Sequence, residues 1–292
     1  MAGLPLLLVL AVTALVGIGV AVVRRSPPSR EGSVAAARRH ATTASVGAVA
    51  AGVLAALVVP FSDGSWGTGE PASGGRELML VPLAFGIAHT VVLTVGELTW
   101  PRPAGQVRRA RLVRRGPLDA APAGLVRSAG AAVVLAVLTV VVGALVADGD
   151  GRGISRSGEL WARSSGPFPG WFYGGPALAG LALLVALVGA ALWVVATRAA
   201  VLTADDRIEA ALRSASAHRV LRGATAAVLL LAGGLLGVAG TAAHSLGSGP
   251  TPSPLGPVGA AVAVLGLACV AAGLVVLCRR APGVPADQPV PA

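Results

Sequence analysis

Three polar side chains inside one long apolar segment, residues 78–100, are the best candidates for chemistry: His89, Thr90 and Glu97. Glu97 is the only acidic residue in the sequence that lies inside a long apolar segment. A carboxylate within a membrane costs about 3 kcal/mol near the midplane, so its presence points to function. On a helix, Thr90 and Glu97 lie near one face, and His89 lies about 100° from Thr90. The three residues form a candidate intramembrane polar site, suited to a path for protons or cations.

A simpler interpretation applies to Glu97 and to the histidines. Glu97 lies about one helical turn, or ~5 Å, from the end of its segment, so it can pair with Arg102 or another loop arginine. His89 lies about 16 Å from the start of its segment, whereas His244 lies at the end of a later segment that runs the opposite way. The two imidazoles are too far apart to share a metal, whose bonds are about 2 Å long. We favour an ion pair for Glu97 and hydrogen bonds at helix contacts for both histidines.

The stretch Asp148-Gly-Asp150-Gly-Arg152-Gly153, followed by Glu159, nearly matches a calcium-binding EF-hand loop. The first, third, sixth and twelfth positions carry suitable residues. The fifth is Arg152, a cation where the ion needs an oxygen ligand. We therefore predict a flexible turn between two helices here, and no metal site.

No other motif indicates an enzyme. The chain has none of the metalloprotease, serine hydrolase, P-loop or dinucleotide-binding fingerprints. All 23 basic residues are arginine, and without a lysine no Schiff base to retinal or pyridoxal phosphate can form. Cys269 and Cys278 lie in one apolar segment and are typical of buried small side chains rather than of a disulfide framework. We predict no catalytic residue and no cofactor.

Long apolar helices must position the polar residues. Hydrophobic residues make up 54% of the chain and charged residues 12%, and the hydrophobic ones occur in blocks. A block of about 20 residues crosses a hydrocarbon layer of about 30 Å as a helix. The sequence therefore predicts an all-α, polytopic membrane helix bundle over residues 1–281. Its seven predicted transmembrane helices are 4–23, 41–61, 78–100, 129–147, 171–197, 224–244 and 258–278.

Two further segments lie outside the spans. Residues 204–221 predict a cytoplasmic helix, either separate from the sixth span or continuous with it. It begins with a capping pattern at Thr203-Ala-Asp-Asp206, and Glu209 lies four residues before Arg213, a spacing that suits an ion pair. The Pro-rich residues 282–292 predict a disordered tail.

The arginines predict how the bundle is oriented. With seven spans, 19 arginines fall on one side of the membrane and four on the other. Because arginine-rich loops stay in the cytoplasm, the N-terminus should lie outside and the C-terminus inside, in a multi-pass protein of the plasma membrane. The net charge of +10 then favours anionic lipid headgroups on the cytoplasmic side as partners, and not nucleic acid. The sequence identifies no protein partner.

One arginine cluster in the loop after the third span has two interpretations. It contacts a lipid phosphate or an acidic partner, or it only sets the topology. The cluster consists of Arg108, Arg109, Arg111, Arg114 and Arg115.

Small residues predict how the sixth and seventh spans pack. In lipid, helices associate through close backbone contact at glycine and alanine. The sixth span carries glycines at offsets of four and three, which place them on one seam of the helix, and the seventh repeats this pattern. We predict that the two spans pack through Gly233, Gly237, Gly240, Gly259, Gly266 and Gly273.

Two short segments resemble parts of multi-pass membrane proteins of high-GC Gram-positive bacteria. They are Gly96-Glu-Leu-Thr-Trp100-Pro-Arg-Pro103 and Ser216-Ala-His-Arg-Val-Leu-Arg222. They cover a small part of the chain, and the resemblance implies no function.

Three functions stay open. The first is a non-enzymatic membrane protein of structural, accessory or signalling-partner type. The second is a small-solute or proton-coupled transporter that uses Glu97 and His89, and the third is an intramembrane enzyme. A cavity that reaches Glu97 would favour transport, and a salt-bridged Glu97 in a tightly packed bundle would favour the first function.

Overall fold

The structure is a computed structural model that describes residues 32–61, 75–100, 116–201, 206–249 and 253–284. Within these ranges, six helices are long and apolar enough to cross a membrane. They are α2 (Gly32–Val58), α3 (Arg76–Leu98), α4 (Ala123–Val146), α5 (Trp171–Thr197), α6 (Asp206–Gly247) and α7 (Leu255–Cys278). This confirms a multi-pass helical bundle, whereas the predicted first span, 4–23, lies outside the described residues.

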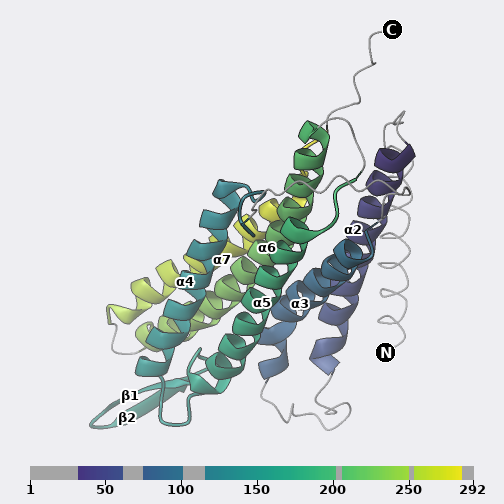
Figure 1. Cartoon of the computed structure of the whole chain (residues 1–292). Coiled ribbons are helices and arrows are strands. Elements are labelled where there is room, and N and C mark those ends of the chain that lie inside the picture. Colours follow the sequence, from purple (N-terminus) through teal and green to yellow (C-terminus); the bar gives the residue numbers. More distant parts are fainter. Residues whose placement is uncertain (1–31, 62–74, 101–115, 202–205, 250–252, 285–292) are drawn as a thin grey trace.

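Consecutive helices run in alternating directions, so the bundle has two distinct ends (Figure 1). At one end α3, α5 and α7 finish while α2, α4 and α6 begin; we call it the charged end. Ten of the arginines in the described ranges lie there. At the other end, the hairpin end, the described arginines are Arg76, Arg152, Arg156 and Arg163.

Helix α6 is the centre of the bundle. Its 42 residues form one continuous helix, which packs against α3, α4, α5 and α7. The predicted cytoplasmic helix and the sixth span are thus a single element. The helix is continuous through Gly223, although glycine usually weakens a helix interior, and the imidazole of His89 packs directly on this glycine. Many alanines and glycines on all its faces let four neighbours approach closely.

Helices α4 and α7 present apolar side chains outward, as lipid-facing helices do. Leu145 is 81% exposed and Leu267 is 68% exposed. A row of such side chains would be costly in water and is favourable in hydrocarbon. The buried apolar core lies on the inner faces, where Leu83, Leu184 and Leu235 are almost fully enclosed.

Helices α6 and α7 touch backbone to backbone at their glycines. A Cβ atom added to Gly240 would lie 2.6 Å from the carbonyl oxygen of Gly259, and one added to Gly266 would lie 2.7 Å from that of Gly233. A Cβ on Gly273 would lie 3.2 Å from the carbonyl oxygen of a residue in α6. Any side chain at these positions would push the helices apart, because the facing atoms are backbone.

Gly237 differs from the other seam glycines. A Cβ atom added to Gly237 would have no atom within 4 Å. The backbone nitrogen of Gly237, however, would lie 2.7 Å from a Cβ added to Gly266. The backbone of Gly237 therefore belongs to the contact, but a side chain there would point into open space. The spacing of the glycines in the sequence predicts the same role for Gly237 as for the other seam glycines. The rotation of α6 about its own axis gives Gly237 a different side-chain direction.

A β-hairpin stands where a flexible turn is expected. Strands β1 (Ile154–Gly158) and β2 (Trp161–Ser165) pair antiparallel, with Arg156 opposite Arg163. At the base of the hairpin, Ile154 packs in a cluster with apolar side chains from the last turns of α6. That anchoring, rather than any alternating pattern in the strands, is what the sequence analysis missed. The hairpin extends beyond the ends of the helices (Figure 1).

The bounds of several other described helices differ from those predicted from the sequence. Helix α2 begins at Gly32 rather than at 41, and a short 3-10 helix, η1 (Val59–Phe61), follows it. Part of the predicted tail is packed, because Val284 contacts the cluster that contains Trp100. Residues 285–292 lie outside the described ranges.

Candidate functional site

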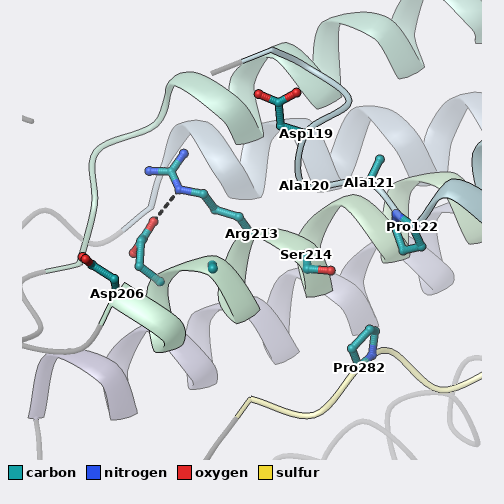
Figure 2. Close-up of a pocket in the computed structure, with 10 residues that line it drawn as sticks. Asp119, Ala120, Ala121, Pro122, Asp206, Arg213, Ser214 and Pro282 are labelled. Carbon is teal, nitrogen blue, oxygen red and sulfur yellow. Dashed lines mark hydrogen bonds and ion pairs between the residues drawn. The ribbon is translucent and has the colours of Figure 1, made fainter. Parts of the chain in front are cut away.

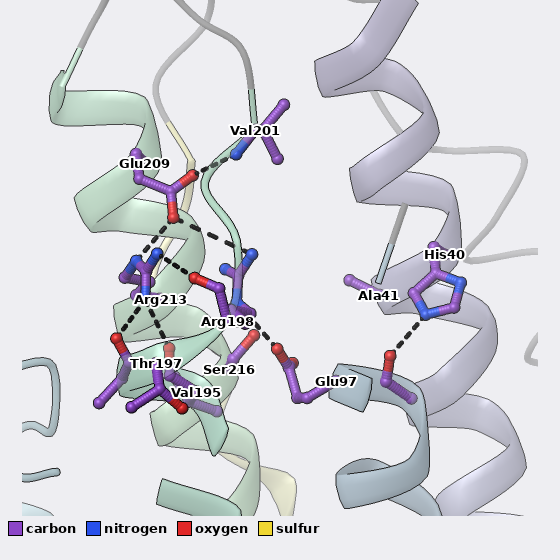
Figure 3. A network of polar contacts seen from close by, with 12 residues as sticks. His40, Ala41, Glu97, Val195, Thr197, Arg198, Val201, Glu209, Arg213 and Ser216 are labelled. Carbon is purple, nitrogen blue, oxygen red and sulfur yellow. Dashed lines mark hydrogen bonds and ion pairs between the residues drawn. The ribbon is translucent and has the colours of Figure 1, made fainter. Parts of the chain in front are cut away.

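Glu97 forms an ion pair at the charged end of the bundle. Its Oε2 lies 3.0 Å from Nε of Arg198, the residue that follows α5 (Figure 3). The side chains are 9% and 2% exposed, respectively. Burial lowers the pKa of the Arg198 guanidinium, and the carboxylates of Glu97 and Glu209 oppose that shift. The sequence suggested Arg102 or another loop arginine as the partner; Arg198 is one of these others, and Arg102 lies outside the described residues.

A second carboxylate extends this network into α6. Oε1 of Glu209 lies 2.6 Å from Nε of Arg213, which confirms the ion pair expected from their spacing. The same oxygen lies 4.0 Å from Nη1 of Arg198, and Oε2 accepts a hydrogen bond from the backbone of Val201. Glu97, Arg198, Glu209 and Arg213 therefore form one chain of alternating charge, which we call the ion network.

Arg213 also closes the carbonyl end of α5. Its guanidinium donates to the carbonyl oxygens of Val195 and Ala196 at 2.7 Å and of Arg198 at 2.8 Å. The last carbonyls of a helix have no partner within the helix, and a cation there also opposes the negative end of the helix dipole. One side chain from α6 thus satisfies the end of α5.

Basic side chains from neighbouring helices also cap the ends of α3 and α7. Nε2 of His40, from α2, donates to the carbonyl oxygen of Gly96 at 2.7 Å. Nη1 of Arg222, from α6, donates to the carbonyl oxygen of Arg279 at 2.7 Å. Within the described part of the chain, each of the three helices that finish at the charged end is therefore capped by a basic side chain of a helix that begins there.

Trp100 packs beside the ion network. The Cζ atom of Arg198 lies 3.7 Å from the centre of the indole, and the imidazole of His40 meets the same ring edge-on. Trp100 is 6% exposed, and its Nε1 has no hydrogen-bond acceptor among the described residues. Nε, Nη1 and Nη2 of Arg198 also lack a hydrogen-bond partner there, as does Oε2 of Glu97.

His89 and Thr90 lie deeper in the bundle, apart from Glu97. His89 is 1% exposed and stacks on Phe85, while Gly223 of α6 presses on its ring. Nδ1 of His89 and Oγ1 of Thr90 have no partner among the described residues. The structure thus places these residues on one helix but joins only Glu97 to a network.

The remaining predicted residues have separate places. Nδ1 of His244 bonds with the carbonyl oxygen of Gly256 at 2.9 Å, at the contact between α6 and α7. Asp148 accepts a hydrogen bond from Ser155, and Asp150 accepts one from the backbone of Arg152. The stretch that resembles an EF-hand loop therefore forms a turn at its start and then strand β1. The cluster Arg108, Arg109, Arg111, Arg114 and Arg115 lies outside the described residues.

A groove of about 690 Å³ opens at the charged end (Figure 2). Asp119 before α4, Asp206 and Ser214 of α6, and Pro282 after α7 line it, together with Glu209 and Arg213 of the ion network. Its lining includes neither Glu97 nor Arg198. Arg213 already donates hydrogen bonds to carbonyl oxygens and to Glu209. The groove is therefore lined by the part of the ion network whose hydrogen bonds are already formed.

Sequence reasoning did not single out Arg198, Arg222 or His40. Each lies within a turn of the boundary of an apolar segment, which is the available signal that a basic side chain could cap a helix. The identity of the capped helix depends on which helices are neighbours, and this is not visible in the sequence. Searches against protein-family models, curated proteins and solved structures gave no match to this chain.

Proposed function

We propose that this chain is a non-enzymatic integral membrane protein of structural, accessory or signalling-partner type. The observation that carries the proposal is the ion pair of Glu97 with Arg198, whose side chains are 9% and 2% exposed. The groove at the charged end does not include either residue in its lining. On this proposal the intramembrane acid holds helices together, rather than being offered to a solute.

The capping contacts support a static role. A transporter must open each end of its bundle in turn, which requires helices to separate. Here Arg213 joins α6 to α5, Arg222 joins α6 to α7, and His40 joins α2 to α3. Opening the charged end would break these bonds and expose buried charges.

The proposal includes an orientation and a location. The charged end faces the cytoplasm and anionic lipid headgroups, and the hairpin end faces outward, in the plasma membrane of a bacterium. The support is the distribution of arginine, with ten described residues at the charged end and four at the other. The fixed charged end, with the groove and the first turns of α6, is the surface offered to a partner.

Flux measurements test the static role. Purified protein in liposomes receives an imposed potassium diffusion potential, and an enclosed dye reports pH. We expect proton entry equal to that of protein-free liposomes, for the wild type and for Glu97→Gln alike. Proton entry that depends on the protein and is abolished by Glu97→Gln would contradict the proposal.

Proton-coupled transport is the second candidate, and one observation favours it. His89 and Thr90 are buried in the middle of α3 with Nδ1 and Oγ1 unpartnered. Polar groups without partners inside a membrane are costly and mark functional sites. Proton entry in the same liposomes that His89→Asn reduces would establish this candidate over the first.

A further inference from the structure

The donors around Trp100 and Arg198 exceed the acceptors. Nε of Arg198 lies 3.0 Å from Oε2 of Glu97 in an ion pair, and Nη1 is 4.0 Å from Glu209. Neither nitrogen has a hydrogen-bond partner among the described residues, and Oε2 of Glu97 is the one buried acceptor there that also lacks a partner. Nη2 has no partner among the described residues, although the side chain is 2% exposed. Buried guanidinium groups normally bond through most of their five N–H donors, so this group lacks an acceptor.

Trp100 lacks an acceptor at the same place. Its indole lies directly under the guanidinium, with 3.7 Å between Cζ and the ring centre. Nε1 is buried and unpartnered. Nη2 of Arg198, at the end of α5, and Nε1 of Trp100, at the end of α3, are thus both without an acceptor. Because the two groups are stacked, one acceptor can serve both.

The local charge favours an anion as that acceptor. The described charged groups that act on Arg198 are the carboxylates of Glu97 and Glu209 and the guanidinium groups of Arg213 and Arg219, so that with Arg198 itself this set carries one positive charge in excess. Arg219 hydrogen-bonds to neutral oxygens of α2 and to Ser216, so it brings no further anion. Phosphate oxygens suit the fork of a guanidinium, because two of its N–H groups can bind them in parallel.

We propose that Arg198 and Trp100 together bind a phosphate-type oxyanion, through Nη2 and Nε1. The site lies where α3 and α5 end, which is the depth of the lipid phosphates in a bilayer. Two sources share this chemistry, the phosphodiester of an anionic lipid and free inorganic phosphate. The binding stands independently of whether the protein transports protons.

The matched pair of variants is Trp100→Phe and Trp193→Phe. Trp100→Phe keeps an aromatic ring under the guanidinium and removes only the N–H donor. Trp193 lies near the same end of α5 but is 57% exposed, so its replacement controls for the loss of a tryptophan. Delipidated protein in neutral detergent is titrated with phosphatidylglycerol, with inorganic phosphate, and with chloride at equal ionic strength, and native mass spectrometry counts the bound molecules.

We expect one tightly bound phosphate-bearing molecule in the wild type and in Trp193→Phe, and binding about tenfold weaker in Trp100→Phe, because a hydrogen bond to a charged group is lost. Binding of phosphatidylglycerol without binding of phosphate assigns the lipid as the source, and binding of both assigns the free anion as well. Equal affinity in the two variants, or no binding above chloride, overturns the proposal, since water then satisfies the donors.

A second measurement covers a Trp100→Phe protein that does not fold. In a variant whose other four tryptophans are phenylalanine, the single indole N–H resonance belongs to Trp100. We expect this resonance to move downfield on addition of the bound species identified above. A resonance that stays fixed at saturating phosphatidylglycerol and phosphate contradicts the proposal.

Discussion

The Nε atom of Arg198 lies 3.0 Å from Oε2 of Glu97, and this contact joins the end of α3 to the end of α5. Both side chains are buried, so a partner left alone would be poorly solvated. Charges held this way are costly to separate but not always favourable to form. The contact therefore makes the packing of the charged end sensitive to either residue alone.

Removing one partner of this pair should destabilise the bundle. Glu97→Gln leaves the Arg198 charge with one distant carboxylate, and the loss of folding free energy should reach about 3 kcal/mol. Glu97→Gln combined with Arg198→Met should cost less than the sum of the single changes. Unfolding in detergent, followed for all four proteins as a double-mutant cycle, measures the coupling. Additive effects would show that the pair contributes no interaction energy.

Arg213 should tolerate no substitution. Arg213→Met removes three carbonyl caps and the partner of Glu209, and the thermal midpoint should fall by several degrees. Arg213→Lys should not restore it, because a compact ammonium cannot reach all four acceptors. Arg280→Met is the control, since Arg280 is exposed. A lysine variant as stable as the wild type would contradict this capping role.

The glycines of α6 should differ in their response to alanine. Gly240→Ala places a methyl group 2.6 Å from a carbonyl oxygen of α7 and should lower the thermal midpoint clearly. Gly237→Ala meets no atom within 4 Å, so it should be neutral or slightly stabilising through helix propensity. Melting curves of the two variants in the same detergent decide this. Equal losses would mean that the rotation of α6 differs from the one described.

Gly223 and His89 should be coupled. A methyl group on Gly223 would contact the imidazole ring, which has no room to move between α3 and α6. Gly223→Ala should therefore destabilise the wild type by about 1–3 kcal/mol, the cost of overpacking a core. In a His89→Ala background the same methyl group should enter the vacated space and cost less. A cost that does not depend on residue 89 would contradict the contact.

The proposed orientation can be tested by cysteine labelling in intact cells. In a background with Cys269 and Cys278 replaced by alanine, Leu160→Cys lies at the tip of the hairpin, where the side chain is 98% exposed. An impermeant maleimide should label this cysteine from outside. Ala210→Cys, which lines the groove, should react only after permeabilisation. The reverse pattern would invert the orientation.

The apolar blocks were sufficient to predict the described helices, because length and hydropathy alone decide whether a segment can cross a bilayer. The pair of Glu209 and Arg213 followed from local helix geometry as well. The partner of Glu97 did not, since Arg198 is distant in sequence and several arginines were equally available. Capping by His40 and Arg222 depends on helix neighbours in the same way.

Two features that the sequence did not reveal have local causes. The hairpin was missed because its strands are short and polar, and its base is fixed by apolar side chains of α6. Gly237 does belong to the seam through its backbone, and only the direction in which a side chain there would point was not visible, because a spacing of three or four residues defines a face only to within about 40–60°. The exact rotation of α6 against α7 separates it from Gly240.

The capping of one helix by the next implies an order of assembly. When the ribosome releases α3, its cap, His40, already exists, whereas α5 emerges before Arg213 has been made. The carbonyl end of α5 must wait for the beginning of α6, and α7 then finds Arg222 in place. A nascent chain stopped after α5 should therefore be recognised as incomplete by membrane quality-control proteases, while one that extends through α6 should persist.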